Sequence, residues 1–467
     1  MPEALSRKSE PEQMAPPQQI SEAPTPARQH SADLSWGRYP HAQHRSIHKP
    51  TWTDDLPQIF EAGTSGSLLP RGLGRSYGDS CLNDGRDLVD CSRLDRFQGF
   101  DTEQGVLRCE AGVTLADVLH VAIPRGWFLP VTPGTRFVTI GGAIANDVHG
   151  KNHHRAGTFG HHVRKMAVYR SDYGLLPCSP EENPDLFHAT IGGLGLTGII
   201  AWAEIQLRRI WSSRIDVETI PFHSFQEFQK LSSESDDKFE YTFAWLDALS
   251  GPRTQGILFR GNHDKKPNLE VRNNKPTAVA DVIPAWLLNR YSILAFNKIY
   301  FRGKSSGKKA WLQSYDSFFY SLDSFARWNR LYGKNGFLQY HCVVPENNCA
   351  AIEEILRLSA ESRPGAFNAE LKRFGSAPAA GMLSFPRPGL TLVLDFPMRG
   401  ESTLRLLDSL DNVVLNVGGA LYPAKDARMN PAMFAASFPR WRTFEKYIDP
   451  KLSSSFWRRV TTTPEQP

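Results

Sequence analysis

The order of hydrophobic and polar positions divides the chain into two blocks. In residues 36–209, short apolar runs alternate with glycine-rich turns, a pattern typical of strands joined by tight loops. Residues 210–417 combine β-rich runs such as GFLQYHCVVP (336–345) with amphipathic helical patterns such as NNCAAIEEILRLSAES (347–362). The second block is therefore predicted to be an α+β domain with an antiparallel sheet, and residues 418–467 are predicted to return to the first domain.

The length of the chain agrees with this division. A single hydrophobic core seldom serves more than about 250–300 residues, so 467 residues predict two domains. Residues 1–35 are rich in Pro, Glu, Gln and Ser and have no apolar run after their basic residues, which predicts a disordered tail rather than a signal peptide. No stretch of about eighteen uncharged apolar residues occurs, so no transmembrane helix is predicted. We expect a protein that is cytoplasmic or peripheral to the inner membrane.

Charge and cysteine content narrow the class of protein further. The net charge of +5 arises from 54 basic and 49 acidic residues, a balance that argues against a nucleic-acid partner and allows only local basic patches. The six cysteines are widely separated and form no CxxC pair; they are Cys81, Cys91, Cys109, Cys178, Cys342 and Cys349. They are predicted to be mostly buried free thiols in a reducing compartment.

Three glycine-rich segments are candidate ligand loops. They are SLLPRGLGRSYGDS (67–80), VTPGTRFVTIGGAIANDVHG (131–150) and IGGLGLTGIIAWAEIQLRR (191–209). Glycine lets the backbone approach a ligand closely, and consecutive N–H groups can surround a phosphate, although a tight turn or close strand packing would also explain each segment. The third segment has the GxGxxG spacing, but the residues after it alternate like a strand, whereas a nicotinamide site needs a helix there. Three loops joined to strands suit a ligand longer than a mononucleotide.

These segments resemble the FAD-binding domain of the vanillyl-alcohol oxidase or p-cresol methylhydroxylase (PCMH) superfamily. The motifs FAWLDALS (243–250), ARWNRLYGKNGFLQY (326–340), LSFPRPG (383–389), LDFP (394–397) and LYPAKDAR (421–428) extend the similarity to one family within it, the decaprenylphosphoryl-β-D-ribose 2'-oxidases. The similarity covers nearly everything after the first 35 residues. It implies an α+β, two-domain PCMH-type fold, with an FAD-binding domain in the first block and a substrate domain in the second.

The resemblance implies that FAD is contacted from three parts of the chain. The loop expected to hold the pyrophosphate consists of Arg71, Gly72, Leu73, Gly74, Arg75, Ser76, Tyr77, Gly78 and Asp79. Contacts further along the cofactor are expected from Gly134, Thr139, Ile140, Gly141, Gly142, Asn146, Asp147 and His149, from Ile200 near the adenine, and from Tyr422. Several relatives attach the flavin covalently through a histidine just before the loop serine. Arg75 stands at that place here, so we expect noncovalent FAD.

Oxidation of an alcohol requires a hydride acceptor, a group that takes the hydroxyl proton, and a cation near the charge that accumulates on the reduced flavin. The resemblance implies that Lys425 supplies this cation and binds or deprotonates the hydroxyl, with His149 and Tyr77 as catalytic neighbours. Without the resemblance, a lysine before an aspartate is typical of a surface salt bridge. Substrate or cleft contacts are implied for Lys151, Gln339, Tyr340, His341, Lys372, Val393 and Lys425.

Three of these positions depart from the pattern of the actinobacterial members of the family. His341 stands in place of a glutamine, and Val393 and Asn146 stand in place of cysteines. The resemblance therefore leaves the exact sugar open.

The segment HGKNHH (149–154) raises a second possibility for the site. His149 and His153 have the i, i+4 spacing of a helical metal site, but no Asp or Glu accompanies them and no HExxH motif is present. We therefore predict no metal and place His149 against the flavin and substrate. For His153, His154, His161 and His162 a structural or surface role is expected.

The stretch DVIPAWLLNRYSILAFNKIYF (281–301) is the most apolar part of the second block and lies between basic flanks. Such a pattern suits the surface of an anionic bilayer, and a core helix between solvated loops is the alternative. The favoured function is FAD-dependent oxidation of the 2'-hydroxyl of a polyprenyl-phosphate ribose, with a short-chain reductase as a transient partner that reduces the keto product. Two other functions remain: oxidation of a soluble sugar, polyol or aldonolactone, and a non-catalytic flavin-binding subunit.

Overall fold

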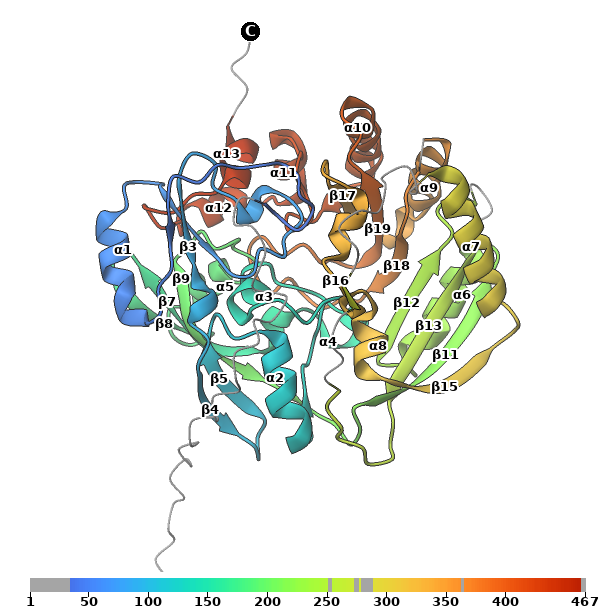
Figure 1. The fold of residues 1–467 in the computed structure, drawn as a ribbon, viewed down its shortest axis with the longest axis horizontal. Coiled ribbons are helices and arrows are strands. Elements are labelled where there is room, and N and C mark those ends of the chain that lie inside the picture. The colour runs from blue at the N-terminus through green and yellow to red at the C-terminus, as the bar shows by residue number, and fades with distance from the viewer. Residues whose placement is uncertain (1–33, 251–253, 273–276, 279–288, 363–364, 463–467) are drawn as a thin grey trace, which may run out of the picture.

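The computed structural model describes residues 34–250, 254–272, 277–278, 289–362 and 365–462. Most of the predicted tail (residues 1–33 of 1–35) lies outside the described residues. The same holds for residues 281–288 of the apolar stretch. Two sheet-containing halves lie side by side in Figure 1, and the C-terminal helices lie along the top of both.

The N-terminal half contains two sheets. Three parallel strands have the order β1-β3-β2, and five antiparallel strands have the order β4-β5-β9-β7-β8. The strands are β1 (Ile47–His48), β2 (Leu68–Arg71), β3 (Asp87–Asp90), β4 (Phe97–Asp101), β5 (Val106–Glu110), β7 (Val163–Arg170), β8 (Gly174–Cys178) and β9 (Ile199–Gln206). The helices of this half are α1 (Leu56–Ala62), α2 (Leu115–Ala122), α3 (Ile140–Ala145), α4 (His153–Ala156) and α5 (Pro184–Thr190). A short antiparallel pair, β6 (Trp127–Phe128) with β10 (Arg208–Arg209), ends it.

The second half is built on an eight-stranded sheet in which every neighbouring pair is antiparallel, as predicted. The order is β15-β11-β13-β12-β18-β19-β17-β20. These strands are β11 (Arg214–Phe222), β12 (Tyr241–Leu246), β13 (Gly256–His263), β15 (Lys309–Ser314), β17 (Phe337–Val344), β18 (Ala369–Phe374), β19 (Gly389–Pro397) and β20 (Ala420–Leu421). Two further strands, β14 (Thr277–Ala278) and β16 (Phe325–Ala326), form a parallel pair.

Helices cover this sheet where its strands are most apolar. All residues of β17 and β19 are buried, because α9 and α10 pack over one face and the N-terminal half lies against the other. The helices of this half and of the C-terminal part are α6 (Phe225–Asp236), α7 (Arg290–Lys304), α8 (Tyr315–Phe319), α9 (Ala350–Glu361), α10 (Glu401–Asn416), α11 (Pro431–Ser437), α12 (Trp441–Glu445) and α13 (Ser455–Thr461). The helical pattern predicted over residues 347–362 corresponds to α9. In α6, Ser224 caps the first turn by accepting from the Glu227 N–H, and Phe225 and Phe228 face the core.

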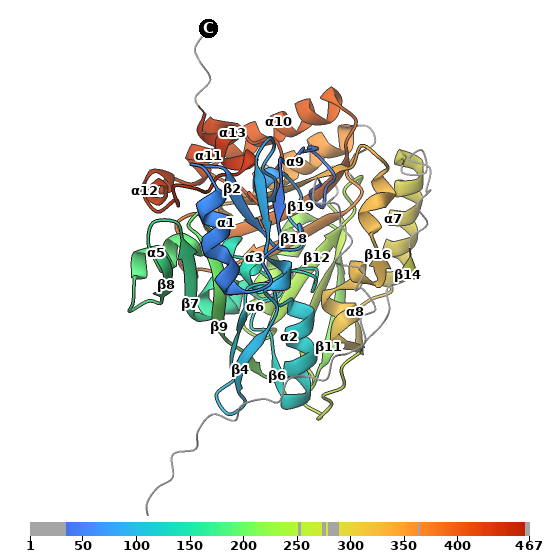
Figure 2. The same ribbon diagram turned by 60° about the vertical axis from the view of Figure 1, so that its left-hand side comes forward.

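The C-terminal segment joins the two halves. Its first strand, β20, extends the large sheet by pairing with β17, whereas the backbone N–H of Leu68 in β2 donates to Lys451 O and that of Ser453 donates to Leu68 O. Figure 2 shows α11 and α13 beside β2 and α1. The segment therefore holds the glycine-rich loop after β2 against the large sheet, and this arrangement forms the site described next.

The six cysteines are free thiols, and four of them are buried. Within the described part of the chain, no helix is both long and apolar enough to cross a bilayer.

Candidate active site

A cavity of about 720 Å³ is lined by both halves of the molecule. Its wall on the N-terminal side consists of the loop after β2, the segment around α3 and the turn before β9. Its opposite wall consists of side chains from the large sheet, α7 and the loop after β20. All three glycine-rich segments of the sequence therefore meet at one space, which is large enough for a cofactor together with a substrate.

The loop after β2 is shaped by its glycines. Gly74 has a φ of +60°, and a Cβ on Gly72 would lie 2.3 Å from Oγ1 of Thr139. Thr139 belongs to the second glycine-rich segment and caps α3, where its Oγ1 accepts from the Gly142 N–H at 3.1 Å. A side chain at Gly72 would push this residue away and so separate the first segment from the second. Close packing also explains Gly141, since a Cβ there would lie 2.9 Å from Cβ of Ala111, although both glycines line the cavity.

Arg75 follows this loop and is the clearest anion-binding group on the wall. Its guanidinium lies 4.0 Å from the ring centroid of Trp36, and its Nε is buried without a hydrogen-bond partner. Burial lowers the pKa of Arg75 to about 10, so the group remains charged at neutral pH. A half-buried cation with an unused donor fits the pyrophosphate of FAD, whose oxygens would accept from the guanidinium. The glycine-lined backbone beside it leaves room for the same group.

The third segment confirms the argument against a nicotinamide site. Gly195, Gly198 and Ile200 line the cavity, and the residues from Ile199 onward form β9, not a helix. The GxGxxG spacing here belongs to a turn that enters a strand.

Four residues expected to contact FAD do not line the cavity. A Cβ on Gly78 would meet the backbone O of Asp426, and Ile140 is fully buried in the core. Asp79 accepts two hydrogen bonds from Arg459, at 2.9 and 2.6 Å. Asp147 accepts from the Gly160 N–H and from the Ser384 hydroxyl. The two aspartates hold the surrounding loops in place. Contacts of all four residues with FAD stay a prediction.

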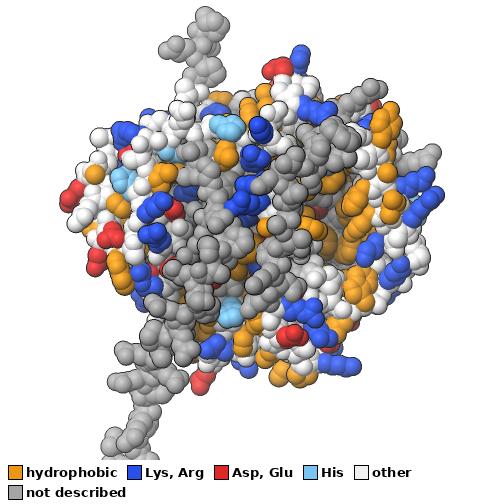
Figure 3. Space-filling view, viewed as in Figure 1, with side chains coloured by type: hydrophobic (Ala, Val, Ile, Leu, Met, Phe, Trp, Pro, Cys, Tyr) orange, Lys and Arg blue, Asp and Glu red, His pale blue; other side chains and the backbone are white. Residues whose placement is uncertain are grey.

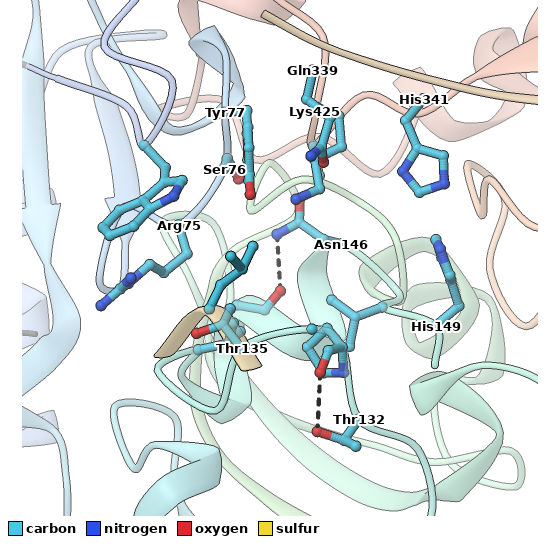
Figure 4. A pocket seen from close by; sticks show the side chains of 18 of the residues that line it. Arg75, Ser76, Tyr77, Thr132, Thr135, Asn146, His149, Gln339, His341 and Lys425 are labelled. Carbon is cyan, nitrogen blue, oxygen red and sulfur yellow. Dashed lines mark hydrogen bonds between the residues drawn. The ribbon is translucent and has the colours of Figure 1, made fainter. Parts of the chain in front are cut away.

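Lys425 reaches the cavity from the loop after β20. Its Nζ lies 3.5 Å from the ring centroid of Tyr77, and Figure 4 shows it between Tyr77 and Gln339. Burial lowers the pKa of Lys425 to about 7, while the charge of Asp395 opposes the shift. Burial also raises the pKa of Asp395 to about 7, and this carboxyl accepts from Nε2 of Gln339 at 2.6 Å. The amine is therefore poised to gain or lose a proton near neutral pH.

His149 lies in an aromatic cluster at the other end of the site. Its ring is 5.1 Å from that of His341 and 5.3 Å from that of Tyr422. The hydroxyl of Tyr422 donates to the backbone O of Asn146 at 2.9 Å, so this residue of the C-terminal segment is fixed to the end of α3. Burial and the neighbouring cations hold the pKa of His149 well below its usual range, which keeps the imidazole neutral.

Of the remaining predicted substrate residues, Lys151 lies in the turn before α4 and reaches the sheet wall, whereas the others are on strands of the large sheet. Lys151 donates to the backbone O of Phe318, its Nζ lies 3.6 Å from the ring centroid of Phe243, and burial lowers its pKa to about 7. Lys372 and Val393 also line the cavity. Tyr340 does not, because it lies between Gln339 and His341 on β17 and alternation turns it to the opposite face.

His149 does not share a helix with the other two histidines of HGKNHH. His149 forms a bridge with Thr158, whereas α4 begins only at His153. His153 is buried against Phe374 and accepts from the Gly375 N–H, and the rings of His154, His161 and His162 each contact a backbone carbonyl. Among the described residues, no group of three or more His, Cys, Asp or Glu side chains would suit a metal ion. His153 is thus a buried structural residue.

The sequence did not single out the aromatic wall or the acidic groups of the cavity. The wall consists of Phe243, Trp245, Phe259, Phe296, Tyr300, Trp311, Phe318 and Phe319, and the acidic groups are Glu370 and Asp395. Phe243 and Trp245 alternate on β12, and Phe243 stacks on its cross-strand neighbour Phe259 at 4.8 Å. The i, i+2 spacing was visible in FAWLDALS, but the partner on β13 is placed only by strand pairing.

Comparison with known proteins bears on this geometry. Residues 47–179 match the model of the FAD binding domain family. The chain is 36% identical over 421 residues to decaprenylphosphoryl-beta-D-ribose oxidase of Mycolicibacterium smegmatis, which covers 85% of this chain and 88% of that protein. The chain belongs to this oxidase family. It is therefore an FAD-dependent oxidoreductase that acts on CH–OH groups, with a PCMH-type two-domain fold.

Two further relatives show how far the family similarity extends. An uncharacterized protein of Streptomyces coelicolor is 29% identical over 74% of this chain and 100% of its own length. Cytokinin dehydrogenase 10 of Oryza sativa subsp. japonica is 29% identical over 48% of this chain and 44% of its own. The similarity to the Streptomyces protein thus covers about three quarters of the chain, whereas the similarity to the plant dehydrogenase covers about half of it.

Proposed function

We propose that the protein oxidises a secondary alcohol of a lipid-linked sugar, the 2'-hydroxyl of a polyprenyl-phosphate ribose, to the 2'-keto sugar. This reaction is the oxidative half of a 2'-epimerisation. One observation carries the proposal: the glycine-rich loop, Lys425 and the aromatic wall, to which α7 contributes Phe296 and Tyr300, all line one cavity. A polar wall for the cofactor, an amine and an apolar wall around one space suit a sugar that carries a lipid.

In this proposal FAD is bound without a covalent link, with its pyrophosphate at Arg75 and the loop after β2. When bound, FAD supplies the hydride acceptor. Protein that is precipitated with acid is then expected to release its yellow colour on washing. A pellet that stays yellow would show a covalent link.

Lys425 is assigned the proton-transfer role. A neutral amine beside the sugar accepts the hydroxyl proton, and in doing so it becomes a cation that offsets charge in the buried site. With a pKa of about 7, a large share of the Lys425 amine is neutral at neutral pH, and it is still basic enough to accept a proton there. The ring of Tyr77 is held by an edge-on contact with Phe337 at 5.3 Å. In this position it lies against the amine of Lys425 and orients it.

The substrate phosphate is assigned to Lys151, in the turn before α4, and to Lys372, on β18 of the large sheet. Lys151 and Lys372 line the cavity, and a phosphate beside Lys151 would favour the charged form of a group whose pKa burial has lowered to about 7. The lipid would then follow the aromatic wall toward α7.

The outer face of α7 supports contact with an anionic bilayer. Tyr291 is 83% exposed and Ile299 is 73% exposed, and Lys298 and Arg302 lie on the same side of the helix. Its inner side contributes Phe296 to the cavity. Figure 3 shows hydrophobic side chains around a hollow on the right of this face, where Figure 1 has α7. A membrane-docked α7 would let the lipid enter without crossing water.

The keto product needs a hydride donor to complete an epimerisation. The partner of this proposal is therefore a reductase, of the short-chain class that the family resemblance implies, and it acts on the sugar after it leaves the site.

Anaerobic mixing of the purified FAD-loaded protein with a substrate panel tests the proposal. The panel contains polyprenyl-phosphate pentoses, free sugars, polyols and aldonolactones, and the measurement is bleaching of the flavin absorbance. Bleaching by the polyprenyl-phosphate ribose alone is expected. Faster bleaching by a soluble compound would favour a soluble-sugar oxidase, and no bleaching by any alcohol would favour a non-catalytic subunit.

A further inference from the structure

His341 lies beside the cavity and carries a buried nitrogen with an unused lone pair. The residue lies on β17, opposite Val393 of β19, and its side chain lines the cavity. Burial, with Lys372 and Lys425 nearby, holds the pKa of His341 well below its usual range. The imidazole is therefore neutral, and only one of its two nitrogens carries a proton.

The hydrogen bonds of Thr391 decide which nitrogen that is. Its Oγ1 lies 2.9 Å from the backbone O of Cys342 and 3.0 Å from Nε2 of His341. A carbonyl has no proton to give, so the single hydroxyl proton of Thr391 lies on the bond to Cys342. The other contact is then a hydrogen bond that Nε2–H of His341 donates to Thr391. Nδ1 of His341 consequently carries no proton and can only accept.

This acceptor has no partner within the described structure. Nδ1 of His341 is buried and makes no hydrogen bond to the protein, and the same is true of Nδ1 of His149. Figure 4 shows the two side chains next to each other at one end of the site, where their rings make an edge-on contact. A buried polar atom without a partner destabilises a protein, and such atoms are rare away from places where a ligand supplies the partner.

We propose that Nδ1 of His341 accepts a hydrogen bond from a hydroxyl group of the bound sugar, and that Thr391 positions it by fixing the tautomer. The inference rests on the proposed function, because it assigns one wall of that site to the sugar. A lone pair repels phosphate and ether oxygens, so the phosphate must bind elsewhere. His341 thereby selects substrates with a free hydroxyl at this place over analogues in which that hydroxyl is methylated or missing.

The tautomer is tested without any substrate. In a two-bond ¹H–¹⁵N spectrum of histidine-labelled, FAD-loaded protein, the signals lost in His341→Leu identify His341. They are expected to show the neutral Nε2–H pattern. In Thr391→Val the pattern is expected to become mixed or to reverse, and in Thr391→Ser it is expected to return. A mixed or Nδ1–H pattern in the wild type would overturn the proposal.

The bond to the sugar is tested with farnesylphosphoryl-β-D-ribofuranose and its 2'- and 3'-O-methyl derivatives. Perturbation of the flavin spectrum gives Kd, and stopped-flow bleaching gives the oxidation rate. His341→Leu and Thr391→Val are each expected to weaken binding of the parent sugar about tenfold, with Thr391→Ser restoring affinity. One of the methyl derivatives is expected to bind the wild type about tenfold more weakly than the parent sugar does. The same derivative and the parent sugar are expected to bind His341→Leu equally well.

The outcomes separate this inference from the proposed function. If the wild type oxidises the ribose probe but His341→Leu binds it equally well, the inference fails and the function stands. If the wild type binds but does not oxidise the probe, and His341→Leu binds it about tenfold more weakly, the function fails and the inference stands. If the wild type does not bind the probe, both fail.

Discussion

The two walls of the cavity are built in different ways. On the N-terminal side, continuous loops supply backbone and glycines, as in the run from Gly72 to Gly74 and the pair Gly141 and Gly142. On the other side, single side chains arrive from strands far apart in the sequence, so that Gln339 and Asp395, 56 residues apart, share a hydrogen bond. The wall on the N-terminal side suits a large cofactor that stays bound. The wall on the other side places separate functional groups around the substrate that reacts. Substitutions on the two walls should therefore fail differently.

Replacing Lys425 by methionine is expected to have the largest effect. Loss of a proton acceptor in the reactive centre should lower kcat about a thousandfold, while FAD content stays near that of the wild type. Stopped-flow bleaching and the absorbance ratio of flavin to protein measure the two quantities. Lys238→Met, at an exposed lysine after α6, is the matched control. Equal loss of FAD and turnover would assign Lys425 to the structure of the site instead.

Arg75→Leu should show the opposite profile. Removal of a half-buried cation with an unused donor is expected to weaken FAD binding roughly tenfold to a hundredfold, with kcat nearly unchanged once FAD is saturating. Fluorescence titration of the FAD-free protein measures the affinity. Arg75→Lys keeps the charge but loses the planar donors, so it should fall between the two. Unchanged FAD affinity in Arg75→Leu would remove this residue from the pyrophosphate site.

The outer face of α7 should affect membrane binding alone. The double substitution Tyr291→Glu and Ile299→Glu is expected to reduce flotation with anionic vesicles about fivefold to tenfold, because it removes apolar area and adds charge repelled by the lipid. Oxidation of a short-chain soluble analogue should not change. Tyr173→Glu is a matched control, since Tyr173 is 71% exposed but lies between β7 and β8. Equal flotation of both variants would contradict membrane contact through α7.

The smallest expected effect is a shift of the pH profile. Since the pKa of Lys425 is lowered to about 7, its neutral fraction grows as pH rises through that value, so kcat/KM should increase with pH and level off above about 7. The carboxylate of Asp395 raises the pKa of Lys425, so Asp395→Asn should move the inflection to lower pH by less than about one unit. An inflection that does not move would mean that another group controls the profile.

The first wall was largely predictable from the sequence. Its glycines and Arg75 lie within short continuous segments, and the strand-like alternation after Gly198 is enough to distinguish the third segment from a nicotinamide motif. The helices and strands at residues 336–345 and 347–362 were also visible as local periodicity. Local chemistry suffices for these features because neighbours in the chain remain neighbours in space.

The second wall was predictable only as a set of residues carried over from relatives. Nothing local indicates that Thr391 fixes the tautomer of His341, or that Phe259 stacks on Phe243, because strand register makes these pairs. The same limit explains Asp79 and Asp147, which the motif places beside FAD and which the fold turns toward Arg459 and Ser384.

By itself, the sequence determined the class of fold, the family and the cofactor, because these depend on patterns within continuous segments. Tertiary structure alone decided the burial that brings the pKa of Lys425 to about 7 and leaves Nδ1 of His341 without a hydrogen-bond partner in the described structure. Desolvation and hydrogen-bond partners depend on which distant segments pack together, and the sheet register with the returning C-terminal segment sets that packing.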